Sequence, residues 1–75
     1  MITVKQSTEA EALFSSMLQP SDRPSRAQIW TAIDSSTRCH GGEHGCAEAM
    51  AEEFGAHPEA ASARMRWALA LVAQI

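Results

Sequence analysis

The most reactive side chains of the sequence lie within one short stretch, CHGGEHGC, at residues 39–46. It combines two cysteines, two histidines and one glutamate with three glycines. Four Cys or His side chains are the usual ligands of structural zinc, and glycines let a chain turn tightly around an ion. The stretch is therefore a candidate zinc site, with the four ligands Cys39, His40, His44 and Cys46.

The same stretch permits thiol chemistry. A disulfide between Cys39 and Cys46 would act as a redox switch. We also expect Cys46 at a helix N-terminus, where exposed N–H groups stabilise a thiolate and His44 could act as a base. However, Cys46 continues the apolar face of the helix that follows, which predicts a small buried core residue. We favour this structural interpretation, in which residues 39–45 form a glycine-rich loop and no cofactor is bound.

The composition indicates a small helical protein. The 75 residues suffice for one domain, and so small a core rarely supplies more than about 3–5 kcal/mol without further support. Fourteen alanines and few β-branched residues favour helices over strands. We expect a cytoplasmic protein, because no secretory signal and no apolar run of membrane-spanning length is found. Five arginines against one lysine are typical of GC-rich bacterial genomes.

The net charge of −3 is distributed unevenly along the chain. Residues 41–59 contain five glutamates and no Lys or Arg, whereas residues 20–40 and 60–75 each carry a small positive excess. Dedicated nucleic-acid binders are usually basic. The acidic centre of the chain therefore favours a protein partner over a nucleic acid.

Hydrophobic periodicity predicts an all-α fold of four helices, with the helices at about residues 8–18, 23–37, 45–54 and 58–74. Thr8 and Glu11 form a capping-box pattern at the start of the first helix. Asp22 or Ser25 is expected to cap the second, with Pro24 in its first turn.

Gly55 and Pro58 mark the corner between the third and fourth helices. Glycine at a helix end favours the left-handed conformation, so we expect a positive φ at Gly55, and proline is favoured at the first position of a helix. The fourth helix is apolar on its inward stripe and on a second stripe beside it. Because so short a chain does not readily cover both stripes, we predict a homodimer through Trp67, Leu71 and Ile75.

Residues 51–66, AEEFGAHPEAASARMR, carry a recognisable pattern around this corner. Ala51 is the small residue expected where the two helices approach, and Gly55 is the turn glycine. Pro58 and Glu59 open the second helix of the pair. The pattern resembles the helix-turn-helix of bacterial DNA-binding domains, including those of sigma factors and repressors.

The resemblance implies a transcription-related regulator whose fourth helix contacts duplex DNA. It implies DNA contacts from three arginines and three other polar residues, namely Arg26, His57, Glu59, Ser62, Arg64 and Arg66. The alternative is a helical module that keeps the same corner and binds a protein. An enzyme is not expected, because no set of nucleophile, base and orienting group can be assembled from the sequence.

Overall fold

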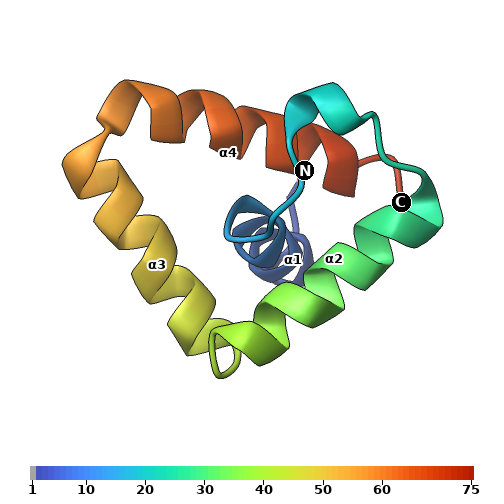
Figure 1. Ribbon diagram of the computed structural model, residues 1–75, viewed down its shortest axis with the longest axis horizontal. Coiled ribbons are helices and arrows are strands. Elements are labelled where there is room, and N and C mark those ends of the chain that lie inside the picture. Colours follow the sequence, from blue (N-terminus) through green and yellow to red (C-terminus); the bar gives the residue numbers. More distant parts are fainter. Residues whose placement is uncertain (1) are drawn as a thin grey trace.

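The structure, a computed structural model, describes residues 2–75 and is all-α, as the sequence predicts. Its elements are four α-helices and one short 3₁₀ helix: α1 (Val4–Phe14), η1 (Pro20–Asp22), α2 (Arg26–Cys39), α3 (Glu43–Ala56) and α4 (Pro58–Val72). Figure 1 shows α2, α3 and α4 as the sides of a triangle, with α1 passing through its middle. Each outer helix contacts α1. Within residues 2–75, no helix combines the length and apolar character needed to cross a membrane.

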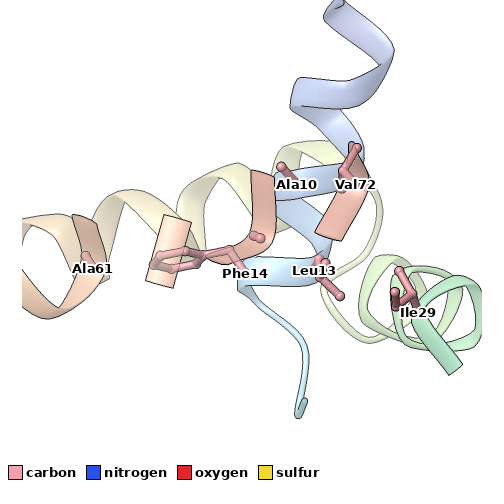
Figure 2. Close-up of a cluster of buried hydrophobic side chains, with 7 residues drawn as sticks. Ala10, Leu13, Phe14, Ile29, Ala61 and Val72 are labelled. Atoms are coloured by element: carbon pink, nitrogen blue, oxygen red, sulfur yellow. The ribbon is translucent and has the colours of Figure 1, made fainter. Parts of the chain in front are cut away.

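The core lies where the outer helices meet α1 (Figure 2). Leu13 and Phe14 of α1 are buried at its centre, together with Ile29 of α2. The ring of Phe14 stacks on that of Phe54 from α3, with 5.8 Å between the ring centroids. On α4, small buried residues such as Ala61 allow the helix to approach α1 closely. Side chains from all four helices thus share one core.

The first helix lies four residues earlier in the chain than predicted, at Val4–Phe14 instead of 8–18. Its capping box is formed by Thr3 and Gln6, which satisfy each other's backbone N–H groups at 3.1 and 3.0 Å. Thr8, the predicted cap, lies inside the helix, and its hydroxyl donates to a carbonyl one turn earlier. The prediction was wrong because two similar capping patterns compete here, and the earlier one starts the helix.

Helix α1 ends at Phe14, directly before Ser15 and Ser16, although residues 15–18 were expected to be helical. The hydroxyl of Ser16 donates to the carbonyl of Leu13 at 2.6 Å and so competes with the helical pattern of backbone bonds. Met17 lies outside the helix and is 95% exposed, whereas Leu18 still packs against the core. Residues 15–18 therefore form an irregular segment on the surface of the molecule.

The second helix is capped by Ser25, one of the two predicted caps. Asp22, the other, belongs to η1, and Pro24 precedes the helix instead of occupying its first turn. The helix continues to Cys39, beyond the predicted end at Thr37. The hydroxyl of Thr37 donates to a carbonyl one turn earlier at 2.8 Å, which is compatible with an uninterrupted helix.

The connection between α2 and α3 is shorter than the predicted loop at 39–45. It consists of His40, Gly41 and Gly42, and the two glycines have φ angles of 75° and 109°. Gly45 lies inside α3, directly against the carbonyl group of His40. A β-carbon at Gly45 would overlap with that carbonyl, so the corner requires glycine at this position.

The corner between α3 and α4 differs from the prediction at Gly55. The helix α3 continues to Ala56, so Gly55 is helical and lacks the expected positive φ. His57 alone joins the helices, with φ −140° and ψ 69°, and Pro58 takes the first position of α4 as predicted. Because a proline disfavours the helical conformation in the residue before it, the chain turns at His57 without a glycine. Ala51, expected at the contact between the helices, is exposed.

Candidate functional site

The four candidate zinc ligands of residues 39–46 are not gathered at one point, although His40 and Cys46 both lie against the carbonyl oxygen of Ser36. Cys39 is exposed at the end of α2, Cys46 is buried, and His44 is exposed on α3. Both cysteines are free thiols. Within the described residues 2–75, no group of three or more His, Cys, Asp or Glu side chains is placed to hold a metal ion. The zinc site considered from the sequence is therefore not formed by this arrangement.

Cys46 is the small core residue that its place on an apolar helix face predicts, with an exposed fraction of 1%. Its thiol lies 3.7 Å from the carbonyl oxygen of Ser36, which can accept the S–H. The backbone N–H of Cys46 donates to the carbonyl of Gly42, so the residue lies one turn inside α3. It is therefore not among the unpaired N–H groups at the helix N-terminus, where we expected a thiolate to be stabilised.

His40 is held by the last turn of α2. Its Nδ1 lies 2.8 Å from the carbonyl oxygen of Ser36. Because a carbonyl oxygen only accepts, Nδ1 carries the proton, and the lone pair of the neutral ring is on Nε2. Nδ1 therefore does not act as a base toward the Ser36 hydroxyl, which lies 3.5 Å away.

Arg64 has a role that the helix-turn-helix resemblance did not predict. Its Nε donates to the carbonyl of Phe14 at 2.7 Å, and one Nη donates to the carbonyls of Ser16 and Leu18, both at 2.9 Å. The guanidinium also lies over the ring of Trp67, 4.7 Å from its centroid. The side chain thus provides donors for carbonyls at and beyond the end of α1. This corrects the expectation that Arg64 extends outward from α4 toward DNA phosphates.

The electrostatics of Arg64 agree with this inward placement. Partial burial lowers the pKa of its guanidinium, and the negative charge of Glu53 opposes that effect in part. An arginine nevertheless keeps its proton at neutral pH. The cation is therefore held mainly by carbonyl oxygens of its own chain, and it anchors α4 to the end of α1.

The other residues predicted to contact DNA lie on several surfaces. Glu59, Ser62 and Arg66 follow one another along one face of α4, and Glu59 and Arg66 are exposed. This face carries one negative and one positive charge, so its attraction to phosphate is weak. His57 is exposed at the corner, and Arg26 lies with one Nη 3.4 Å from a carbonyl oxygen near the C-terminus. The predicted contacts therefore do not form one basic surface.

The predicted dimer face is partly covered by other residues of the same chain. Trp67, Leu71 and Ile75 are half-buried, and all three pack against the core. The argument for a dimer relied on this stripe being uncovered, and internal packing weakens it. Among residues 2–75, the large apolar side chains that are exposed lie elsewhere, at Ile2, Val4, Met17 and Trp30.

A hollow of about 570 Å³ lies between residues 15–18 and one face of α2. Its lining includes Met17, Leu18, Ala27 and Ala32, and within the described part of the chain it contains no Asp, Glu, Lys or Arg. We call it the apolar hollow. It is an open concave surface suited to apolar side chains of a ligand.

A second hollow, of about 460 Å³, adjoins the same segment. Glu52 and Glu53 of α3 line it, with Arg64 beside them, and we call it the acidic hollow. Both hollows are lined by Ser15, Ser16 and His40, so they adjoin one another. Together they form one surface with an apolar part and a charged part.

The sequence reasoning missed this surface because it placed residues 15–18 inside a helix. The signal that was available is the pair Ser15 and Ser16 directly after Phe14, since serine hydroxyls favour helix ends. Which faces of α2 and α3 meet this segment depends on packing between distant parts of the chain, and no local pattern reports that.

Comparisons of the chain with protein-family models, curated proteins and solved structures found no match.

Proposed function

We propose that this protein is a small helical protein-binding module, which holds a segment of a partner protein in the apolar hollow. The observation that carries the proposal is the hollow itself, an open surface without charged lining residues in the described chain. Met17 at its edge is 95% exposed. Exposed apolar surface favours a partner's apolar side chains, and the flexible thioether of methionine adapts to their shape.

The side of α2 that lines the hollow supports a helical partner segment. Ala27, Thr31, Ala32 and Ser35 have short side chains and lie along one side of the helix, and Gln28 is the one long side chain among the α2 residues of the lining. The distance between packed helices depends on the side chains at their contact, so this side permits close approach. An amphipathic helix lying in an apolar groove is a recurrent form of peptide recognition.

DNA binding in a transcription-related role is the second candidate. The resemblance at residues 51–66 and the exposed Arg66 favour it. Against it, three N–H···O bonds direct Arg64 to its own chain, and α3 contributes four glutamates without any Lys or Arg. Both candidates suit the reducing cytoplasm, where free thiols persist.

A titration with one designed peptide tests the protein-binding function. The probe is a fluorescent helical peptide of about 18 residues, or five turns, with Leu on one face and Gln elsewhere. We expect saturable binding that Ala27→Arg weakens at least about tenfold, because the new charge would be buried against leucines. Ala70→Arg is the matched control, since Ala70 is also an exposed helical alanine but lies outside the hollow. Equal binding by the two variants, or no binding of the peptide, contradicts the proposal.

A parallel titration with mixed-sequence duplex DNA tests the second candidate. It is done at about 50 and 200 mM salt, a range over which phosphate-dominated binding weakens strongly. Arg66→Glu is the informative variant, because Arg66 is exposed and its replacement leaves the core contacts of Arg64 intact. DNA binding at the lower salt that Arg66→Glu abolishes would favour the regulator over the protein-binding module.

The homodimer through Trp67, Leu71 and Ile75 stays a separate prediction. Light scattering at high micromolar concentration measures the mass of the species in solution. A dimer that dissociates on Leu71→Arg would support it, and a monomer would remove it.

A further inference from the structure

The charge around the two hollows indicates the chemistry of the partner segment. We propose that this segment is basic and amphipathic, with apolar side chains in the apolar hollow and a Lys or Arg in the acidic hollow. The inference rests on the proposed function, because it assigns a charge to the occupant of the same surface.

The arrangement of the hollows links the two contacts. Ser15, Ser16 and His40 line both, so a segment that fills the apolar hollow reaches the acidic one across them. The hydroxyl of Ser15 donates to a backbone carbonyl of α3, which ties this boundary to the helix that carries the glutamates. The apolar and acidic parts are therefore fixed relative to each other by α1, α2 and α3.

The acidic hollow has carboxylates available for a basic side chain. Glu52 and Glu53 are exposed. Arg64 also lines the hollow and keeps its positive charge while its Nε and one Nη bond to neutral carbonyl oxygens, so two carboxylates face one arginine there. The side-chain contacts between basic and acidic groups found within residues 2–75 lie elsewhere, at Arg38–Asp34 and at His44–Glu48, the second being an ion pair only when His44 is protonated. Neither Glu52 nor Glu53 is in an ion pair within the described chain, but the charge of Glu53 already acts on Arg64, so Glu52 is the carboxylate most available to a partner's ammonium or guanidinium.

The charge of α3 extends this preference beyond the hollow. The helix carries four glutamates and no Lys or Arg, so it presents a negative potential to any approaching molecule. Nucleic acids, acidic peptides and anionic lipid surfaces are repelled by such a surface. A basic protein segment is attracted to it, and charge complementarity of this kind sets the choice of partner.

Three peptides that differ only in their polar face test the inference. Each keeps the same Leu face, and the polar positions are Lys, Gln or Glu. At about 50 mM salt we expect the Lys peptide to bind about fivefold more tightly than the Gln peptide, as two partly exposed charge pairs would produce, and the Glu peptide to bind most weakly. The difference should shrink as salt rises, since exposed charges are screened.

A pair of charge-matched variants locates the effect. Glu52→Gln with Glu53→Gln should remove the preference for the Lys peptide. Glu43→Gln with Glu59→Gln alters the net charge equally at exposed positions outside both hollows and should keep the preference. Circular dichroism on each variant verifies that the helices are intact.

The outcomes separate this inference from the proposed function. Equal affinity for the Lys and Gln peptides, with both weakened by Ala27→Arg, overturns the basic partner and leaves the protein-binding module standing. Equal loss of preference in both double variants also overturns it, because the attraction would then be a property of net charge. Failure of all three peptides to bind overturns the proposed function itself.

Discussion

The two corners that flank α3 are built in different ways. At the α2–α3 corner the backbone itself sets the geometry, through positive φ angles at Gly41 and Gly42 and the contact of Gly45 with the carbonyl of His40. At the α3–α4 corner Gly55 is helical and surrounded by open space, and the chain turns at the residue before a proline. Gly55, which looks like a helix cap in the sequence, thus has room for a β-carbon, whereas Gly45, in the first turn of the same helix, does not.

The second corner is held from a distance. Arg64 ties α4 to the end of α1 by one hydrogen bond to Phe14 and to the segment after α1 by two more, and α3 is tied to α1 by the stacking of Phe54 on Phe14. The angle between α3 and α4 therefore depends on what each helix contacts in the middle of the triangle. Substitutions at the two corners should accordingly have very different consequences.

Gly45→Ala should have the largest effect. The added β-carbon would overlap with the carbonyl of His40, so α2 and α3 must move apart. We expect the free energy of unfolding to fall by about 3 kcal/mol or more, the upper range for overpacking, which would leave so small a protein largely unfolded. Urea denaturation followed by circular dichroism measures this. A loss below about 1 kcal/mol would show that the α2–α3 corner accommodates the added β-carbon by a small rearrangement.

Arg64→Met should have the next largest effect. The variant keeps much of the packing volume but leaves three carbonyls of α1 and the following segment without their donor. We expect a loss of about 2 kcal/mol, in the range for a hydrogen-bonded charged group. Arg66→Met is the control at an exposed position and should change stability by no more than about 0.5 kcal/mol. Similar losses for both variants would contradict an anchoring role of Arg64.

Gly42→Ala should destabilise the α2–α3 corner to a smaller degree. Its φ of 109° with ψ of −174° lies in a region that is essentially restricted to glycine, although the space around it is open. Strain of this kind costs about 1–3 kcal/mol, and because no neighbouring atom has to move we expect a loss near the lower end of that range. Thermal melting measures the loss, and an unchanged melting temperature would mean that the connection adopts another conformation at no cost.

Gly55→Ala should change stability least, and in the opposite direction. The residue is helical and a β-carbon there meets no neighbouring atom within 4 Å. Alanine should therefore stabilise the helix by about 0.5 kcal/mol, because glycine has a poor helix propensity. A loss of stability would instead indicate that Gly55 has the positive φ that the sequence predicted.

Local signals in the sequence predicted the four α-helices, but not every boundary and not the 3₁₀ helix at Pro20–Asp22. Pro58 was identified as a helix start, and Ser25 as one of two possible caps, because a first-turn proline and a hydroxyl cap act within one turn. The start of α1 was misplaced because Thr3 and Thr8 each begin a capping-box pattern, and no local feature of the sequence shows which of the two caps the helix. The all-α class itself follows from composition and periodicity, and it is confirmed.

The inward placement of Arg64 was partly readable from the sequence. Ala61 and Ala68 are both buried, and Arg64 lies three residues after the first and four before the second, on the same helix face. Its partners were not readable, because the bond to the carbonyl of Phe14 joins residues 50 positions apart. The hollows depend on the same kind of distant packing, and for that reason the surface on which the proposed function rests appeared only in the structure.

Backbone amide chemical shifts of the isotope-labelled protein, recorded during titration with the Lys peptide, test the central claim most directly. If the two hollows hold the partner, the largest changes should fall on residues 15–18, on the side of α2 that contains Ala27 and Thr31, and around Glu52. The outer face of α4 at Ser62 and Arg66 should be unaffected. Changes confined to residues 57–66, with α2 unaffected, would contradict binding in the hollows and would place the binding site at the α3–α4 corner.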